Sequence, residues 1–357
     1  MGDERILKEF IARLETMPFI VAWLFLIFLF VFFATKWVRS IALRQDIMDT
    51  PNPRSSHITP TPRGGGLAFV AGISLGHSLL FFYEVNNLWL ICLYFSSLVV
   101  AGTGWRDDQI SLSPTKRLFL QFVATLTLLS AFFPFTTLSV QTVVIPNWAC
   151  WVLLPLFVMW SINLYNFMDG IDGLSSVQAI SVSLGGAMLS YLNGDSLLCF
   201  AFIVIASACF GFLRWNWMPA SIFSGDVGST YLGIMFAGLM LAAVSRGTFS
   251  LTVGIILMGS FYVDATYTLL VRVIKGQKPH EAHKTHTYQK ANRMGHPPNR
   301  ICKAFALINL FWLVPLAWVA SSNAGLEIFL FVVACLPLLG LSIFYKAGIE
   351  ESPLKNT

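Results

Sequence analysis

The chain has 357 residues, of which 56% are hydrophobic and only 11% are charged, and its net charge is +5. Its mean hydropathy of +0.69 excludes an ordinary soluble domain, in which about a quarter of the residues are charged. The composition predicts an integral membrane protein, and we expect one domain over residues 1–357. We expect no cleavable signal peptide, because the first 17 residues are rich in charge and the following apolar run is too long.

Eleven apolar segments follow along the chain, each close to the length of a membrane helix of about 20 residues. They lie at 18–38, 66–83, 88–104, 117–134, 148–165, 174–192, 197–213, 229–245, 250–274, 301–320 and 326–345. The segments are apolar on all sides, which favours an all-α polytopic membrane protein with about 11 transmembrane helices. Between them, residues 136–146 alternate Val and Thr and predict a small hairpin or partial strand.

The basic residues predict an orientation. The loops at 36–65, 105–117, 214–228 and 272–303, together with the C-terminus, hold 19 of the 23 Lys and Arg residues. The positive-inside rule then places the N-terminus outside and the C-terminus in the cytoplasm. Because the clusters rich in Asp, Asn and His fall at the same helix ends, we expect an active site at the cytoplasmic face.

Two clusters of carboxylates and amides are the first candidate functional residues. Carboxylates at a membrane edge are costly unless they meet a cation, a ligand or water. One cluster, at the end of the third segment, is the adjacent pair Asp107 and Asp108. The other begins at the end of the fifth segment and has a polar residue at every third position: Asn163, Asn166, Asp169 and Asp172. A helix cap or a solvated turn remains an alternative for the adjacent pair when it is considered alone.

Glycine-rich turns form two further candidates. Asp226 lies between Gly225 and Gly228 at the start of the eighth segment, where free backbone N–H groups favour a phosphate and the carboxylate can hold Mg²⁺. The alternative is a simple N-cap. Arg63, followed by three glycines, is a linker when taken alone and an anion ligand beside a phosphate substrate.

The last cluster, His280–Tyr288, lies in the longest basic loop. Its histidines, chiefly His283 and His286, are spaced for zinc, but no cysteine is near, so we favour phosphate and sugar binding. A solvated basic loop remains open. One acid, Asp264, lies inside the ninth segment and is too far from Arg272 to pair with it. It either makes a structural hydrogen bond or lines a cavity near a lipid phosphate.

Together these motifs resemble the polyprenyl-phosphate N-acetylhexosamine-1-phosphate transferases of glycosyltransferase family 4, over about residues 50–300. Relatives of this kind start lipid I, enterobacterial common antigen and O-antigen synthesis. The resemblance implies a multi-pass enzyme of the bacterial inner membrane that transfers a sugar 1-phosphate from a UDP-sugar to undecaprenyl phosphate and releases UMP. It also implies a Mg²⁺ or Mn²⁺ cofactor. No nucleic acid partner is expected, and a homodimer is open.

The resemblance assigns catalytic roles by position. Asp107 resembles the family's candidate base for the lipid phosphate, and Asp108 is its partner. Asp226 matches the principal metal ligand, with Asp107 as a second one. Lys116 matches a basic residue beside the acidic pair.

Other positions match the family's substrate contacts. Asn216 and Phe223 match positions that hold the uridine, and Asp169 and Asp172 match contacts around the nucleotide and diphosphate. Arg63 and the two amides Asn163 and Asn166 complete the expected substrate-binding set, with His283 and His286 beside them.

The histidine loop departs from the lipid I and common-antigen types, which carry adjacent histidines where this chain has His283-Lys-Thr-His286. It resembles the O-antigen initiating branch, which implies a 6-deoxy-N-acetylhexosamine donor such as N-acetylfucosamine or N-acetylquinovosamine, with UDP-N-acetylglucosamine next. The alternative function is a proton-coupled transporter. Transporters typically show internal repeats and a midplane site, whereas here the acids gather at one face.

Overall fold

The computed structural model describes residues 2–51, 59–83, 88–132, 139–140, 143–278 and 283–350. Its α-helices are α1 (Gly2–Arg44), α2 (Gly66–Tyr83), α3 (Leu88–Ile110), α4 (Pro114–Ser130), α5 (Asn147–Phe167), α6 (Leu174–Leu192), α7 (Ser196–Asn216), α8 (Asp226–Arg246), α9 (Leu251–Leu257), α10 (Gly259–Ile274), α11 (Thr287–Arg293), α12 (Pro298–Ile308), α13 (Val314–Ser322) and α14 (Glu327–Phe344). A π-helical turn, Asn309–Leu313, joins α12 to α13, and a 3₁₀ turn, Ala324–Leu326, precedes α14. Two antiparallel hairpins pair β1 (Met48–Asp49) with β2 (Thr61–Pro62) and β3 (Ser139–Val140) with β4 (Val143–Val144).

Every apolar segment expected from the sequence is helical over most of its length. The hairpin expected between 136 and 146 is also confirmed, with Val140 opposite Val143. One irregularity lies in the tenth segment, where the π turn interrupts the α-helix just before Pro315. Proline lacks an N–H group and so cannot complete the regular ladder at that point.

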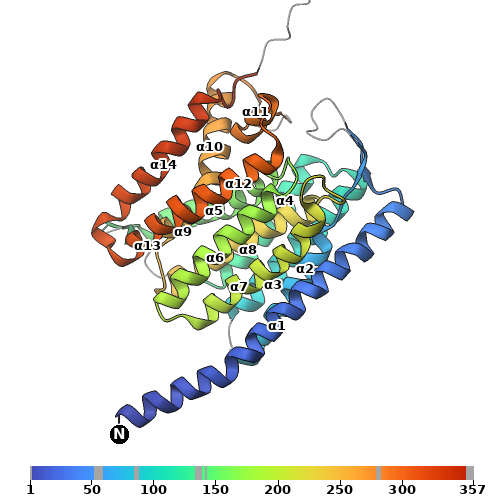
Figure 1. The fold of residues 1–357 in the computed structure, drawn as a ribbon. Helices are drawn as coiled ribbons and strands as arrows, with labels where there is room; N and C mark the ends of the chain where they lie inside the picture. Colours follow the sequence, from blue (N-terminus) through green and yellow to red (C-terminus); the bar gives the residue numbers. More distant parts are fainter. Residues whose placement is uncertain are drawn as a thin grey trace, which may run out of the picture.

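Seven helical stretches in the described part of the chain are long and apolar enough to cross a membrane, or eight if the bent pair α9–α10 forms one span. Residues Gly66–Phe81 of α2 form a shorter apolar helix. The helices pack side by side as a bundle, with α1 along one flank (Figure 1). An all-α, multi-pass membrane architecture is therefore supported, whereas eleven crossings and their orientation remain predictions.

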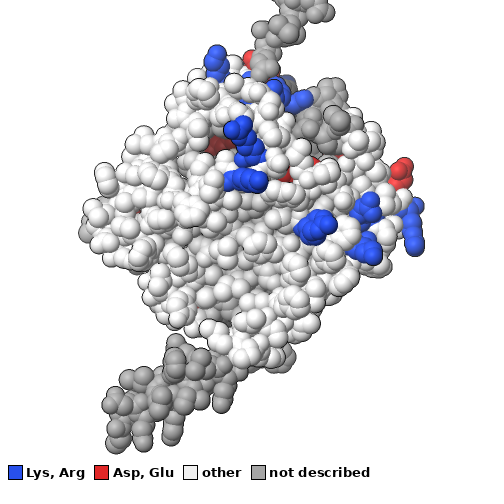
Figure 2. All heavy atoms as spheres, viewed as in Figure 1, with Lys and Arg blue, Asp and Glu red and all other residues white. Residues whose placement is uncertain are grey.

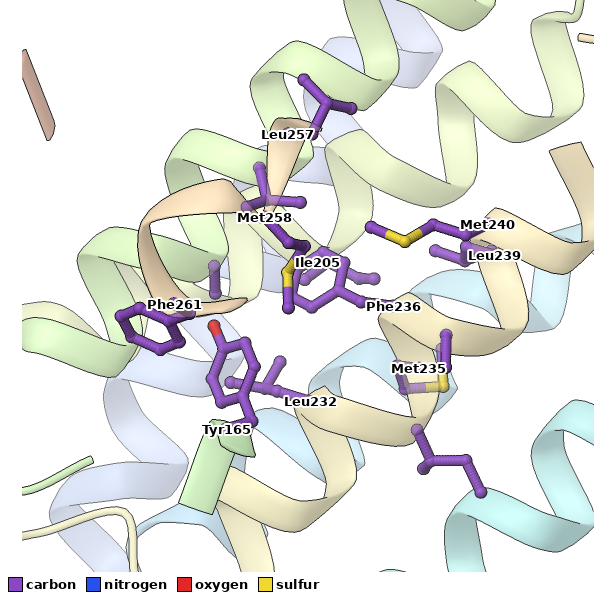
Figure 3. Packing of buried hydrophobic residues seen from close by; sticks show 14 of the residues in the cluster. Tyr165, Ile205, Leu232, Met235, Phe236, Leu239, Met240, Leu257, Met258 and Phe261 are labelled. Atoms are coloured by element: carbon purple, nitrogen blue, oxygen red, sulfur yellow. The ribbon is translucent and has the colours of Figure 1, made fainter. Parts of the chain in front are cut away.

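Helix α8 is the centre of the bundle, and its residues from Val227 to Ala243 are all buried. Its large apolar side chains, among them Phe236, lie toward Tyr165 of α5 and Phe261 of α10 (Figure 3). Helix α5 approaches so closely that a Cβ on Gly233 would lie 2.6 Å from the Ser161 carbonyl oxygen. This packing fixes the start of α8 beside the ends of α3 and α5.

The expected ninth segment, 250–274, is not one continuous helix, because it breaks at Met258 and turns through 86° between α9 and α10. Buried polar groups accompany the break: Ser260 and Asn309 both donate to the Gln178 side-chain oxygen, at 2.9 and 2.6 Å. Hydrogen bonds between side chains satisfy polar groups that lipid cannot. The bend directs α10 toward α11, away from the axes of its neighbours (Figure 1).

Basic side chains lie over the upper half of the face shown in Figure 2, and the lower part of that face carries none. Arg39 near the end of α1 donates to the Ser221 carbonyl at 3.0 Å, which joins two of the expected cytoplasmic segments. Arg246, expected on the opposite side, pairs with Asp195 at 2.7 Å. This separation of charge agrees with the asymmetry from which the orientation is predicted.

Candidate functional site

The adjacent carboxylates at the end of α3 have different partners. Asp108 is buried and accepts the backbone N–H groups of Asp226 at 3.0 Å and Val227 at 3.2 Å, so it caps the start of α8. Asp107 accepts the Leu112 N–H at 2.5 Å and a guanidinium N–H of Arg117 at 2.9 Å. Asp108 is therefore not the local cap or solvated turn considered as the alternative, because it accepts from the start of another helix and holds two expected site segments together.

The basic residue beside the acidic pair is Arg117, whereas Lys116, expected there from the sequence, is exposed. The Arg117 guanidinium lies 2.9 Å from Asp107 and 3.6 Å from Asp226. Successive residues on a helix point about 100° apart, so only one of two neighbouring basic residues can face the acids. Arg117 thus connects the carboxylates of α3 and α8.

Asp226 is the most accessible of the three central carboxylates, with a side chain 31% exposed against 7% for Asp107. The Asn166 amide donates to Asp226 at 2.8 Å and to the Ser229 hydroxyl at 3.0 Å. Asp226 can therefore reach a ligand while its geometry is set by α5 and by its own helix.

The carboxylates that follow α5 hold the neighbouring loops. Asp169 accepts a hydrogen bond from the Ser224 hydroxyl, and burial raises its pKa above the usual value. Asp172 accepts the Ala220 N–H at 2.8 Å, and Asn216 accepts the Gly173 N–H at 3.1 Å. Gly173 has a φ of +80°, a conformation that other residues rarely adopt. These contacts join the end of α5 to the segment between α7 and α8.

A polar cavity of about 250 Å³ lies among these groups. It is lined by eight of the expected site residues, namely Arg63, Asp108, Asn166, Asp169, Asp172, Asn216, Phe223 and Asp226. Arg63 also donates to the Asp108 carbonyl, which brings the glycine-rich turn to the acidic pair. The cavity lining includes two residues that the sequence analysis missed: Asp49, which lies in none of the expected clusters, and Gln289, which directly follows the expected cluster His280–Tyr288.

A second cavity of about 600 Å³ adjoins the first and has mainly apolar walls. Trp160 and Phe167 of α5, Leu118 of α4 and Leu269 of α10 contribute to them. The polar members are Arg117, Asn163, Asn166, Asp226, His283 and His286. Asp226 and Asn166 line both cavities, so a polar chamber and an apolar chamber meet at one carboxylate.

The histidine loop lies on the apolar side. The rings of His283 and His286 are in contact at an interplanar angle of 36° with their centres 4.9 Å apart, and His286 also stacks on Phe167. Burial, with His286 and Arg272 nearby, lowers the pKa of His283 to about 3, so this ring is neutral at physiological pH. His280, part of the expected loop, lies outside the described residues.

The intramembrane acid Asp264 makes structural hydrogen bonds, which was one of its two expected roles. It is buried on α10 and accepts from the Thr268 hydroxyl at 3.1 Å and from the Thr287 N–H at 2.9 Å. As expected, Arg272 does not pair with it, because Arg272 donates to Glu350 at 2.9 Å.

Metal binding is tested by the donor set. No cluster of three or more His, Cys, Asp or Glu in the described ranges is arranged to hold a metal ion. Mg²⁺, however, is commonly held by one or two carboxylates with phosphate oxygens and water completing its shell. The partly accessible Asp226, with Asp107 paired to the same Arg117, fits that pattern.

The fold and site define a helical membrane protein with a polar, phosphate-compatible cavity and an apolar cavity that share an acidic centre. A family model for glycosyl transferase family 4 matches residues 90–244. By this match the chain resembles glycosyl transferase family 4, and the relatives that it matches are polyprenyl-phosphate N-acetylhexosamine-1-phosphate transferases. The matched range contains both acidic clusters and Asp226 but not Arg63 or the histidine loop.

Curated relatives extend the likeness. The chain is 25% identical to a probable undecaprenyl-phosphate N-acetylglucosaminyl 1-phosphate transferase of Bacillus subtilis, over 100% of this chain and 95% of the relative. It is 28% identical to a decaprenyl-phosphate N-acetylglucosaminephosphotransferase of Mycobacterium tuberculosis, over 82% and 79%. It is 29% identical to a phospho-N-acetylmuramoyl-pentapeptide-transferase of Chlamydia trachomatis, over 59% and 68%.

Proposed function

We propose that this protein transfers an N-acetylhexosamine 1-phosphate from a UDP-sugar to undecaprenyl phosphate, releases UMP, and so starts O-antigen or another cell-surface polysaccharide. The reaction would take place at the cytoplasmic face of a bacterial inner membrane. The proposal rests on the names of the relatives and on the two cavities that meet at Asp226.

The meeting of the two cavities is the observation that carries the proposal. A nucleotide sugar is polar and anionic, and the polar cavity offers the Arg63 guanidinium, the Phe223 ring and the Asn216 side chain. A polyprenyl chain is a long hydrocarbon, and the apolar cavity offers Trp160, Phe167 and Leu269. Since Asp226 and Asn166 belong to both cavities, the two substrates would meet there.

The protein's own groups have distinct tasks in this proposal. Asp107, held by Arg117 and the Leu112 N–H, would accept the proton of the lipid phosphate, which then attacks the β-phosphorus of the donor. The bond from that phosphorus to the bridging oxygen breaks, and UMP leaves. Arg117 would neutralise charge on the lipid phosphate, and Asn166 would keep Asp226 oriented. A two-step route through a phosphosugar on Asp107 has the same residues and remains an alternative.

A divalent metal is part of the proposal. When bound, Mg²⁺ would neutralise the charge that develops on the diphosphate as UMP leaves. Asp226 is the proposed ligand, because it lines both cavities and is held by Asn166. Asp107 is the proposed second ligand, because it pairs with the same Arg117 side chain as Asp226.

We further propose that the segment from His283 to Gln289 chooses the sugar, with a 6-deoxy-N-acetylhexosamine donor preferred over UDP-N-acetylglucosamine. The segment touches both chambers, because His286 lines the apolar cavity and Gln289 lines the polar one. The backbone N–H of His286 donates to the side-chain oxygen of Gln289 at 3.2 Å, which couples the two positions. A site that hydrogen-bonds a substrate hydroxyl strongly rejects a donor that lacks it, whereas an apolar pocket rejects an added hydroxyl less strongly, so a few side chains of this segment would distinguish the two donors.

The test is UMP release by the purified protein in detergent, with UDP-N-acetylglucosamine and its 6-deoxy relatives offered separately. UMP release should require undecaprenyl phosphate, and the 6-deoxy-N-acetylhexosamine donor should have the highest kcat/KM. Asp226→Asn, folded and membrane-extracted like the parent, serves as the matched inactive control. Absence of UMP release with every donor, alongside proton-coupled solute uptake in vesicles, would establish the transporter instead.

A further inference from the structure

The last helix and the turn that follows it fold back onto the histidine loop. We call residues 342–350, which are the end of α14 and this turn, the C-terminal clasp. Within the clasp, Ala347 is fully buried and the Gly348 N–H donates to the Thr285 carbonyl at 2.8 Å. Thr285 lies directly before the second histidine of the loop, so this hydrogen bond holds the backbone that carries the histidine rings.

Two further contacts of the clasp lie on either side of α11. The Thr287 hydroxyl, at the start of α11, donates to the Ser342 hydroxyl at 2.9 Å, and Ser342 is only 1% exposed. The His296 ring, beyond the end of α11, meets the Tyr345 ring edge to face with centres 6.3 Å apart. The clasp therefore contacts both flanks of the short helix that begins within the histidine loop.

The other side of the clasp presses on α10. Gly348 has a φ of +77°, and a Cβ on it would lie 2.7 Å from the Val271 Cβ and 2.8 Å from the Thr268 carbonyl oxygen. Neither a backbone oxygen nor a Cβ atom can rotate away, and side chains rarely adopt this backbone conformation. Glycine thus lets the turn fit between α10 and the histidine loop.

An ion pair ties the far end of the clasp to the same helix. Arg272 of α10 is 1% exposed and donates to the Glu350 carboxylate at 2.9 Å, whereas the Glu350 side chain is 59% exposed. The Nε atom of Arg272 has no hydrogen-bond partner among the described residues. A buried cation is costly unless an opposite charge faces it. Glu350 supplies that charge, and so the buried guanidinium favours the docked clasp.

We infer that the C-terminal clasp controls donor choice: it holds Thr285 and Thr287 against α10 and thereby fixes the segment from His283 to Gln289. The inference rests on the proposed function and deepens it, because this segment is the proposed reader of the sugar. The clasp residues, all within the described part of the chain, line neither of the two cavities, so they position the segment and do not touch a substrate. Loosening the clasp should therefore change sugar selection and leave the acidic centre intact.

Gly348→Ala in the full-length protein is the test. The KM for the preferred UDP-sugar should rise by up to about tenfold, the effect of losing one neutral hydrogen bond, and the kcat/KM ratio between the 6-deoxy and N-acetylglucosamine donors should fall toward one. Inhibition by UMP should stay as in the parent, because the uridine contacts lie elsewhere. An unchanged donor ratio, or an equal change in UMP inhibition, would overturn the inference.

The matched control is Gly340→Ala on α14, where a Cβ would meet nothing within 4 Å. This variant should keep the donor ratio of the parent, and equal losses in both glycine variants would overturn the inference. If Gly348→Ala fails to fold, Glu350→Gln replaces it and should move the donor ratio in the same direction. Lys346→Gln, at an exposed position of the clasp, is its charge control and should leave the ratio unchanged. An unchanged ratio in folded Glu350→Gln would then count against the clasp.

The direct readout is hydrogen–deuterium exchange of the α11 amides, followed by mass spectrometry. These amides should exchange faster in Gly348→Ala than in the parent or Gly340→Ala, while those at the start of α8 should not change. Equal exchange of α11 in all three proteins would show that the clasp does not hold the segment. The measurement needs no substrate, so a parent that releases no UMP would count against the proposed function, while the exchange would still decide whether the clasp holds α11.

Discussion

The sharpest test of the site's architecture is Gly104→Ala. Helix α3 passes the start of α8 so closely that a Cβ at this position would lie 2.5 Å from the Asp226 carbonyl oxygen and 2.6 Å from the Val227 nitrogen. These are backbone atoms that cannot rotate away, so the contact would have to open beyond 3.0 Å, and to 3.4 Å for ordinary van der Waals contact. Such overpacking typically lowers the free energy of unfolding by 1–3 kcal/mol, and we expect about 2 kcal/mol here.

The opening would reach the chemistry, because Asp108 lies one helical turn further along α3. Its hydrogen bonds to the Asp226 and Val227 N–H groups, now 3.0 and 3.2 Å, would exceed hydrogen-bonding distance if the helices separated by the same amount. Asp226 would then move relative to Asp107 and Arg117. A displacement near 1 Å at a reacting centre can cost about 100-fold in rate, so we expect a loss of that order in kcat.

The matched control is Gly102→Ala, two residues earlier on the same helix, where a Cβ would meet nothing within 4 Å. UMP release and thermal unfolding in detergent should show this variant close to the parent, since Ala is also the better helix former. Gly104→Ala with kcat within threefold of the parent, or equal losses in both variants, would refute the argument from close packing.

Three further predictions concern the metal, the orientation and pH. Asp226→Asn should lower turnover more than 100-fold, equivalent to about 3 kcal/mol of transition-state stabilisation, and EDTA should stop the parent; normal UMP release in either case contradicts the metal role. A cysteine placed at Lys284 should resist an impermeant reagent in intact cells, and its labelling would reverse the orientation. Because the pKa of His283 is lowered to about 3, below its unfolded value near 6.5, its contribution to stability is present above pH 6.5 and lost toward pH 3. His283→Gln should therefore flatten the fall of the melting temperature on acidification, and an unchanged pH profile would show that the histidine is not buried in its neutral form.

The helices and the identity of the acidic site could be predicted because both are local signals. Long apolar runs show where helices lie, and carboxylates at their ends are expensive enough to indicate function. Asn166 and Asp226, 60 residues apart, were expected in one site and share a 2.8 Å hydrogen bond. Which of two neighbouring basic residues faces the acids depends on the direction of the side chains around the helix, and Arg117, next to the expected Lys116, is the one that pairs with Asp107.

The break in the ninth segment could not be predicted, because hydropathy runs through it without interruption and no proline marks it. The bend decides where Asp264 lies. On a straight helix this acid would be several turns inside the membrane, whereas on α10 it faces the backbone of the histidine loop. Its partners, Thr287 and Tyr288, are more than 20 residues away, and nothing near Asp264 in sequence indicates them.

Under the proposed function, the bend also explains how one site has both a polar cavity for a soluble donor and an apolar cavity for a lipid acceptor. A soluble donor and a lipid acceptor need adjoining polar and apolar walls, and a bundle of straight helices supplies a polar wall only at its ends. By turning through 86°, the ninth segment brings Leu269 into the wall of the apolar cavity that Trp160 also lines, and Asp264 on the same helix accepts the Thr287 N–H in the loop that bears His286. The apolar chamber thereby reaches the acidic helix ends, and Asp226 lies where the two chambers join.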